Sequence, residues 1–450
     1  MTNVTWILCA ACLVLAPFPA LLALAAVALL GLTVVRALLK PTELRWDLVA
    51  ALVLVNFAYW GLNALFVAGY WPHELLSWSF LRWQARGVLC YVPLLLLGLR
   101  AADVRLPLGK IVRAYVLISA AVAVLGLLQI LVGVQPQIAN DMQLSLWPVR
   151  WFQGEPWFFG FYRSHSAAGA GFAAAALGAW VLLLFREEED PRVMLPAFVL
   201  LAWALMFTKS RTYVCAFLPT AFLSWLAAAV IRRRPIVRHL WVGAGFLLVL
   251  GLATFMVPRG PERFLSLPGI SHRMFASAPE PQQQAGEGAR TKPGDSADMG
   301  TVTAMNRRTY WDAALKMAKT HPVFGVGLGR YGREFYDMGY RTPWKPRLAM
   351  MHAHNSALHY LAELGAVGLL LQAALWGAIL WAILRAAWNR LPDLNPTAVF
   401  TLFALALLVM NMAASLVGHV LWSPAAMLPT VAALTLALRR PADIAQARSP

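Results

Sequence analysis

The sequence has little charge of either sign, and acidic residues are especially scarce. Only 13% of the 450 residues are charged, whereas a soluble domain typically has about 25%. Hydrophobic residues make up 60% of the chain. This composition excludes an ordinary soluble enzyme and a disordered protein, and it indicates a polytopic membrane protein.

Cysteine is also rare, and basic residues are missing from the N-terminal region. The four cysteines, Cys9, Cys12, Cys90 and Cys215, all lie inside apolar runs. Cys9 and Cys12 have C-x-x-C spacing, but a redox thiolate must reach solvent, so we interpret all four as packing or lipid-facing residues. No Lys or Arg precedes Arg36, so we expect no cleavable signal peptide.

Long apolar runs dominate what is present. About twelve segments are long enough, or nearly so, to cross a hydrocarbon core of about 30 Å. They cover approximately residues 4–17, 19–39, 47–68, 80–99, 110–133, 164–186, 193–209, 211–231, 240–257, 362–388, 396–418 and 424–438. Only Pro17 and Pro19 separate the first two, so a single kinked helix is an alternative there. The sequence therefore predicts an all-α membrane protein with about 12 transmembrane helices.

The distribution of basic residues predicts the orientation. The chain has 38 Lys and Arg against 21 Asp and Glu, for a net charge of +17. With both termini in the cytoplasm, the inner loops and tail hold 18 basic residues. The short outer loops and span ends hold six, namely Arg82, Arg86, Arg150, Arg163, Lys209 and Arg211. The positive-inside rule favours this orientation, and since topology explains most of the charge we expect no nucleic acid partner.

This orientation divides the chain into four parts. They are residues 1–257 with nine transmembrane helices, 258–354 as a large periplasmic loop, 355–438 with three further helices, and 439–450 as a cytoplasmic tail. Long loops are where functional lids and sites concentrate, and the catalytic end of this loop is expected just before residue 355.

The periplasmic loop itself has three kinds of sequence. Residues 278–300 are rich in Gly, Pro and Gln and are expected to be flexible. Residues 303–320 predict a helix with Tyr310, Ala314 and Met317 on one face, and His321-Pro322 should end it. The glycines at 325, 327 and 329 indicate turns rather than a phosphate loop, because no strand precedes them and no Lys-Ser/Thr follows.

Several basic residues gather on the predicted outer side. A basic residue at a span centre costs about 2.5–3.5 kcal/mol, and a charge-assisted hydrogen bond returns roughly 1.5–3 kcal/mol. Several arginines that converge on one polyanion, such as a pyrophosphate at the lipid interface, are therefore favoured over one alone. The candidates are Arg163, Lys209, Arg211 and Arg308. Arg82 and Arg86 are secondary, because residues four apart near Trp83 also fit a simple anchor for a span end.

The end of the loop carries two histidines followed by an asparagine. Asn355 is a good helix N-cap, and Gly365 and Gly368 would allow close helix packing. From spacing alone, His354 could be a polar residue at a loop end.

A zinc site is an alternative for these histidines. It would use His352 and His354 together with His321 or His359. Neither an H-E-x-x-H pattern nor a cysteine pair supports it, and no D-x-D pair lies in a structured stretch, so we expect no metal.

Together these motifs resemble the O-antigen ligase and polymerase superfamily over about residues 160–390. The motifs are His354-Asn355-x9-Gly365-x-x-Gly368, Lys209-Ser210-Arg211, Arg308-x-x-Trp311 and Pro322-x-x-Gly325-x-Gly327. The resemblance implies a GT-C-like fold and transfer of a glycan from an undecaprenyl-diphosphate carrier, without metal or nucleotide cofactor. It also implies a bacterial inner-membrane protein whose active site faces the periplasm.

Among members of the superfamily, we favour an O-antigen ligase, which uses lipid A–core as acceptor and completes lipopolysaccharide. O-antigen polymerases and O-linked protein oligosaccharyltransferases are alternatives, although the latter often carry a further soluble C-terminal region. A transporter of lipid-linked glycan is an alternative of another class, but it should show internal repeats, and none is evident. A purely structural assembly protein would not explain the outer basic residues.

Residues and resemblance agree on the roles. Arg211 and Arg308 are expected to hold the donor pyrophosphate, with Arg163 and Lys209 assisting. His354 is expected to act as general base, because nearby arginines keep the imidazole neutral.

Two further polar residues near this site have less definite roles. Ser210 is interpreted as a hairpin residue rather than a nucleophile. Glu363 is either a partner for an arginine or a support for His354.

Overall fold

The computed structural model describes residues 2–41, 44, 47–69, 87–99, 106–132, 149–152, 155–162, 164–185, 190–232, 299–340, 351–391, 395–418, 420–421 and 423–439. Helices dominate these residues. Their bounds are α1 Thr2–Val14, α2 Pro19–Leu39, α3 Leu48–Leu62, the π-helix η2 Asn63–Val67, the 3-10 helix η3 Val92–Gly98, α6 Leu108–Val132, α7 His165–Phe185, α8 Pro191–Phe207, α9 Arg211–Arg232, α12 Met299–Thr320, α13 Tyr331–Asp337, α14 Ser356–Arg390, α15 Pro396–Ser415 and α16 Pro424–Leu438. Two short antiparallel strands, β1 Val149–Phe152 and β2 Glu155–Phe158, form a hairpin that the sequence did not predict.

The helices confirm a polytopic α-helical membrane protein. Within the described residues, seven helices of at least 18 residues are apolar enough to cross a membrane, and four shorter apolar helices accompany them. Eleven of the twelve predicted segments fall on these helices, and segment 240–257 lies outside the described residues. α1 and α2 are separate helices, so the single kinked helix is wrong. The number of spans and the orientation stay predictions.

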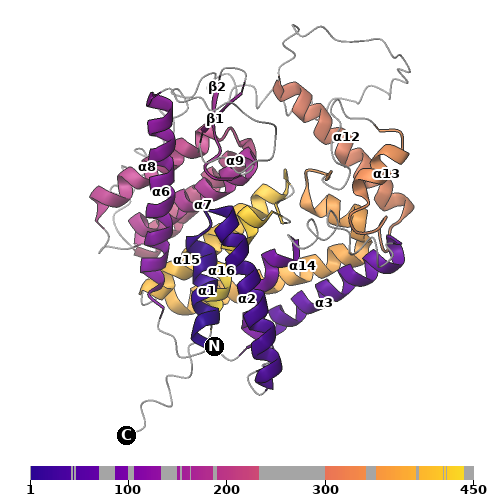
Figure 1. Cartoon of the computed structure of the whole chain (residues 1–450), viewed down its shortest axis with the longest axis horizontal. Helices are drawn as coiled ribbons and strands as arrows, with labels where there is room; N and C mark the ends of the chain where they lie inside the picture. The colour runs from indigo at the N-terminus through magenta and orange to yellow at the C-terminus, as the bar shows by residue number, and fades with distance from the viewer. Residues whose placement is uncertain are drawn as a thin grey trace.

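The main bundle is built around α7. Ala and Gly fill much of this helix, which lets α6, α8, α9 and α15 approach it closely, and almost all of its residues are buried (Figure 1). A Cβ on Gly169 would lie 2.5 Å from the Ser210 Cβ. The tight fit of α7 therefore fixes the turn between α8 and α9.

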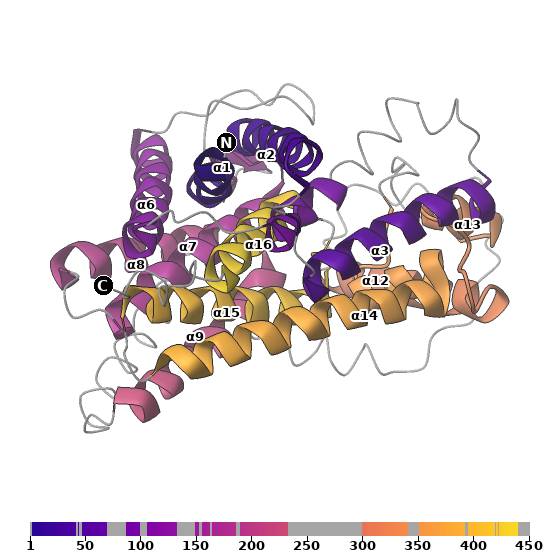
Figure 2. The same ribbon diagram turned by 90° about the horizontal axis from the view of Figure 1, so that it is seen from below.

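α3 and α14 lie side by side and extend away from the main bundle (Figure 1 and Figure 2). Buried polar groups join them within the apolar contact. Asn56 of α3 donates from Nδ2 to the Leu371 carbonyl at 3.4 Å and accepts from Gln372 Nε2 at 2.9 Å. Because a buried amide needs partners, these bonds fix how the two helices align.

A second, smaller hydrophobic core joins α12, α13 and the start of α14. Its members are Tyr310, Ala313, Ala314, Met317, Val326, Tyr331, Phe335, Met351, Ala353 and Ala362. The predicted face of the loop helix is thus confirmed, and α12 ends at Thr320, two residues before Pro322. Figure 1 shows α12 and α13 next to the far end of the α3–α14 pair.

α14 begins at Ser356, six residues before the predicted apolar segment, and it breaks at Gly365. There φ is 65° and ψ is −166°. The loop before α13 inserts into α14 at this point, and its backbone groups replace two hydrogen bonds within α14. The exchanged bonds run from Ala366 N to the Pro322 carbonyl (2.8 Å), from Val367 N to Val323 (3.2 Å), from Val326 N to Ala362 (2.9 Å) and from Gly327 N to Glu363 (2.9 Å). Every donor and acceptor that the break frees is therefore satisfied.

Gly365 and Gly368 of the motif have different structural roles. A side chain at Gly365 would be strained by the positive φ of this residue and would collide with the Val323 carbonyl, so this glycine admits the inserted loop rather than a neighbouring helix. The expectation of helix packing is wrong for this position. At Gly368 a Cβ would lie 3.1 Å from the Tyr59 ring of α3, which agrees with close helix packing.

Candidate functional site

His354 lies in the turn that precedes α14, in a strained backbone conformation. Its φ is +52°, and its backbone N–H donates to Nδ1 of His352 at 3.3 Å. The other non-glycine residue with positive φ in the described part of the chain is Lys209, at +56°. Such strain is common at functional sites, and both residues were candidates from the sequence.

Aromatic and imidazole rings surround the His354 side chain. The Tyr310 ring centroid lies 5.2 Å away and that of His352 lies 4.3 Å away. Burial lowers the pKa of His354 well below its usual range, and the nearby His352, Arg307 and His359 lower it further. His354 is therefore neutral at physiological pH and can accept a proton.

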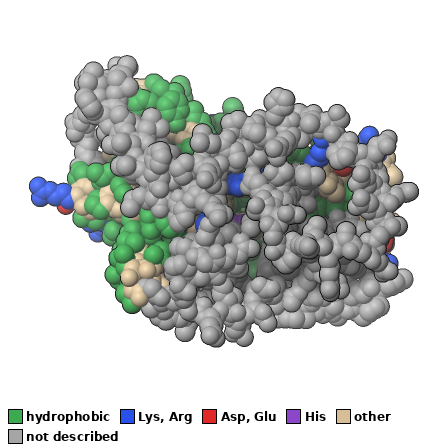
Figure 3. All heavy atoms as spheres, turned by 90° about the horizontal axis from the view of Figure 1, so that it is seen from above, with side chains coloured by type: hydrophobic (Ala, Val, Ile, Leu, Met, Phe, Trp, Pro, Cys, Tyr) green, Lys and Arg blue, Asp and Glu red, His purple; other side chains and the backbone are tan. Residues whose placement is uncertain are grey.

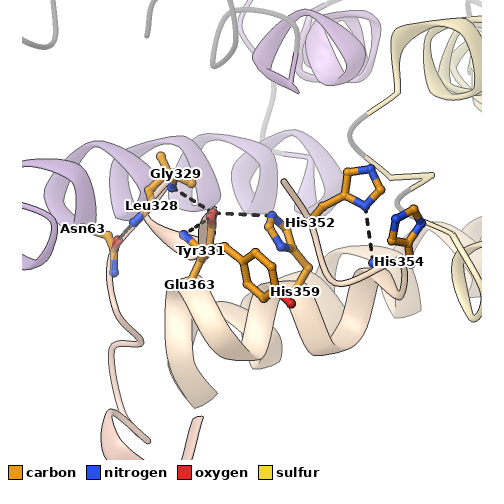
Figure 4. Close-up of polar contacts among 8 residues, drawn as sticks. All are labelled: Asn63, Leu328, Gly329, Tyr331, His352, His354, His359 and Glu363. Atoms are coloured by element: carbon orange, nitrogen blue, oxygen red, sulfur yellow. Dashed lines mark hydrogen bonds and ion pairs between the residues drawn. The ribbon is translucent and has the colours of Figure 1, made fainter. Parts of the chain in front are cut away.

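His352 shares this environment and lies beside His354 in Figure 4. Burial and the charge of Arg307 lower the pKa of His352 to about 4. Its Nδ1 accepts the His354 backbone bond, so it supports the turn that holds His354. This contact gives His352 a structural role, while any role in transfer stays a prediction.

Arg307 is the residue that links the histidines to α9. It lowers the pKa of both His352 and His354, and its own pKa is lowered first by burial and then by Arg211. Arg307 therefore lies close enough to each of these groups to act on its charge. Its Nε atom is buried and has no hydrogen-bond partner among the described residues. A buried guanidinium N–H without a partner is available to an anion.

The sequence interpretation chose Arg308 rather than Arg307. Adjacent residues on a helix point about 100° apart, so Arg307 and Arg308 leave α12 in different directions. Arg307 precedes Tyr310 by three residues and Ala314 by seven, which places it on the buried face of α12. Extending that face backwards along the helix would have identified Arg307, whereas the role of Arg308 stays a prediction.

Arg211 is the first residue of α9 and directly follows the turn that α7 holds. In this turn the Ser210 N–H donates to Thr208 Oγ1 at 3.2 Å, and the Ser210 side chain is buried. Arg211 is half-buried, and it stands at the N-terminus of α9, where the positive end of the helix dipole lies. Both the charge and the helix terminus favour a bound anion.

Three basic candidates cannot be placed. Arg163, Arg82 and Arg86 lie outside the described residues, so their roles stay predictions.

Asn355 caps α14 and ties it to the end of α15. Its Oδ1 accepts from the Leu358 N–H at 3.0 Å, and its Nδ2 donates to the Leu416 carbonyl at 2.9 Å. Ser356 adds a bond from Oγ to the Gly418 carbonyl at 3.1 Å. The N-cap interpretation is confirmed, and the cap holds the adjacent His354 in place.

Among the described residues, Glu363 forms no hydrogen bond or ion pair with an arginine or with His354. Its two carboxylate oxygens accept backbone N–H bonds from Gly329 (2.8 Å) and Tyr331 (3.0 Å). The His359 Nε2 atom lies 3.5 Å from Oε2. The two roles that the sequence suggested are thus replaced by a third, which is to hold the loop before α13 (Figure 4).

The arrangement can hold an anion beside a proton acceptor. Seen from above in Figure 3, Lys or Arg side chains and a histidine reach the surface near the centre of the face. In the ranges that the structure describes, no three His, Cys, Asp or Glu side chains are grouped as ligands for a metal ion. What the described groups supply is positive charge from Arg211 and Arg307 and a neutral imidazole from His354.

A comparison with known families matches this region. Residues 196–373 match the family model described as O-antigen ligase. The match begins in α8 and ends in α14, so it includes Arg211, Arg307 and His354. This part of the chain is similar to the O-antigen ligase family, and the similarity supports membership of that family.

Members of the O-antigen ligase family are glycosyltransferase-like enzymes, and the similarity over residues 196–373 is consistent with lipid-linked glycan substrates in a lipid bilayer. No curated protein matches this chain. The donor, the acceptor and the side of the membrane are therefore inferred from the chemistry of the site.

Proposed function

We propose that this protein is an O-antigen ligase that transfers polysaccharide from undecaprenyl diphosphate to lipid A–core on the periplasmic side of the bacterial inner membrane. One observation carries the proposal: Arg307 lies close enough to both Arg211 and the neutral His354 for their charges to interact, and the three residues come from separate elements. Two cations beside a neutral base suit a reaction in which a pyrophosphate leaves while a hydroxyl loses its proton.

The arginines bind and stabilise the leaving group. Each guanidinium can give two parallel hydrogen bonds to phosphate oxygens, and the N-terminus of α9 adds backbone donors. Negative charge grows on the pyrophosphate as its bond to the sugar breaks, so these contacts strengthen in the transition state. Lys209, Arg163 and Arg308 are further candidates for the same anion.

His354 takes the proton of the acceptor. The acceptor hydroxyl oxygen attacks the anomeric carbon, the bond from that carbon to the pyrophosphate oxygen breaks, and its electron pair leaves with the pyrophosphate. The hydroxyl proton passes to the His354 imidazole. One displacement inverts the anomeric configuration and needs no covalent nucleophile, metal ion or nucleotide cofactor. Ser210 is buried against Gly169, which fits a structural residue.

O-antigen polymerase and O-linked protein oligosaccharyltransferase activities would use the same groups with another acceptor. Family membership favours glycan transfer over the transport of a lipid-linked glycan. The choice among the three transferases therefore depends on the hydroxyl that reaches His354.

The test uses purified full-length protein in lipid nanodiscs with undecaprenyl-diphosphate-linked glycan and a chelator. Lipid A–core, a second carrier-linked glycan and a Ser/Thr-containing protein are offered in parallel, with His354→Ala as the inactive control. A ligase modifies only lipid A–core, and NMR of the product should show the inverted linkage. Transfer to one of the other acceptors would assign the corresponding alternative. A reaction that requires an added metal would contradict the assignment of His354 as general base.

A further inference from the structure

Two buried polar side chains hold the glycine loop, which we define as residues 322–331, from two different helices. The first is Asn63, where α3 passes into the π-helix η2. Its Nδ2 donates to the Phe324 carbonyl at 2.8 Å, and its Oδ1 accepts from the Leu328 N–H at 2.7 Å. The Asn63 side chain is 1% exposed, so both of its polar ends depend on the loop.

The second side chain is Glu363 of α14. Each carboxylate oxygen accepts one backbone N–H of the glycine loop, Oε2 from Gly329 and Oε1 from Tyr331. The residue is 5% exposed. Its own carbonyl accepts a third bond from Gly327. The carboxylate therefore fixes both the position and the direction of the loop as it enters α13.

The glycine loop has only a weak conformational preference of its own. Gly325, Gly327 and Gly329 have φ values of 73°, 107° and 75°. Glycine adopts such values freely, but it adopts many others as well, so the loop loses much conformational freedom when it orders. The contacts with Asn63 and Glu363 select this one conformation.

The glycine loop leads directly to the site. The Tyr331 hydroxyl donates to the Tyr310 carbonyl of α12 at 2.6 Å, and the Tyr310 ring packs 5.2 Å from the His354 ring. Arg307 lies one turn before Tyr310 on the same helix. A shift of the loop would therefore move Arg307 relative to His354.

We propose that Asn63 and Glu363 are positioning residues that set α12, with Arg307, against the His354 end of α14. Neither residue touches the reacting atoms. The kinetic part of this inference rests on the proposed function, in which Arg307 and His354 act on the two sides of one transfer. A misplacement of about 1 Å between such groups can cost about 10²-fold in rate.

Asn56 provides a matched control. It lies two turns before Asn63 on α3, is also 1% exposed, and bonds to Leu371 and Gln372 of α14. It joins the same two helices but, among the described residues, forms no hydrogen bond with the glycine loop. If Asn63 acted only by holding α3 against α14, Asn56→Ala would have the same effect as Asn63→Ala.

The kinetic experiment compares Asn63→Ala, Glu363→Gln and Asn56→Ala after each has been shown to be monodisperse and folded. We expect kcat to fall by about 10- to 100-fold in the first two variants and by less than about threefold in Asn56→Ala. In an Arg307→Ala background, the two loop variants should have little further effect, because groups that act as one unit are not additive. Equal loss in Asn56→Ala, or full additivity with Arg307→Ala, would overturn the inference.

A second measurement does not depend on activity. Spin labels at Leu315→Cys on α12 and Leu370→Cys on α14, both exposed positions, report the distance between the two helices in a Cys215→Ser background. Asn63→Ala and Glu363→Gln should broaden or shift the distance distribution, and Asn56→Ala should leave it as in the wild type. Unchanged distributions in both loop variants would overturn the inference.

The two measurements also separate the inference from the proposed function. A wild-type protein that transfers glycan to no acceptor would refute the function alone, since the distances would still test the positioning. Glu363→Gln keeps the shape of the side chain and one acceptor oxygen. This variant therefore tests the positioning role if Asn63→Ala does not fold.

Discussion

Replacing Arg307 is the most direct test of the site, because this residue was found only in the structure. The change Arg307→Ala removes a half-buried guanidinium whose Nε atom has no partner among the described residues. The adjacent change Arg308→Ala removes an identical side chain that leaves α12 in another direction around the helix axis. The pair therefore separates the position of a charge from its mere presence on the helix.

The magnitude follows from the hydrogen bonds that Arg307 can offer a pyrophosphate. Two charge-assisted bonds contribute about 1.5–3 kcal/mol each, or about 3–6 kcal/mol together. If both bonds are lost in the transition state, kcat/KM should fall by roughly 10²–10⁴-fold. Arg307→Lys should recover only part of this loss, because a point charge cannot reproduce the planar fork.

The same change should not reduce stability. Burial and the charge of Arg211 lower the pKa of Arg307, so folding disfavours its charged form at neutral pH. Arg307→Ala removes this unfavourable term, and its Tm should equal or exceed that of the wild type apart from lost packing. A steep fall in Tm would show that Arg307 is a structural residue.

The assay measures initial rates of transfer to lipid A–core in nanodiscs, with thermal melts of the same preparations. We expect Arg307→Ala to be strongly impaired and Arg308→Ala to be much less affected. Near-normal rates in Arg307→Ala, together with a large loss in Arg308→Ala, would refute the assignment of Arg307 to the pyrophosphate.

Four further outcomes are expected. His354→Ala should lower the initial rate by about 10²–10⁴-fold, and a near-normal rate would leave the reaction without this base. Because the pKa of His354 is lowered, wild-type kcat/KM should stay constant as the pH falls through the ordinary histidine range near 6.5, and an acid limb in that range would contradict a buried neutral base. Gly365→Ala should lower Tm or prevent folding, whereas Gly377→Ala on the same helix, with no described atom within 4 Å of the new Cβ, should keep or raise Tm in thermal melts. Single cysteines at Gln283 and Ile236 should react oppositely with an impermeant thiol reagent, and labelling of both from outside would contradict the periplasmic loop.

Much of the architecture could be predicted because hydrophobic content is a local property. A run of about 20 apolar residues has few stable solutions in a bilayer, so eleven segments became described helices close to the predicted positions. The loop helix α12 could also be predicted, because its apolar spacing and Pro322 both lie within one short stretch of sequence. Asn355 followed from the side-chain chemistry of helix caps.

The inserted loop could not be predicted in the same way. The Gly365 and Gly368 spacing is typical of helix packing, and only contacts with Pro322 and Val323 reveal that the helix opens at Gly365. These partners lie more than forty residues away in the chain. Hydrogen bonds between such distant segments leave no periodic signal.

The amino-acid sequence was sufficient to predict the class of protein and most of the helices, and it suggested the kinds of residue at the site: arginines for an anion and a histidine for a proton. The tertiary structure was needed to show that Arg307 interacts with His354, and that Asn63 and Glu363 hold the glycine loop. The physical reason is that composition and periodicity report the free energy of moving a segment out of water. Which charged group faces which partner depends on the rotation of each helix, and packing among distant segments sets that rotation.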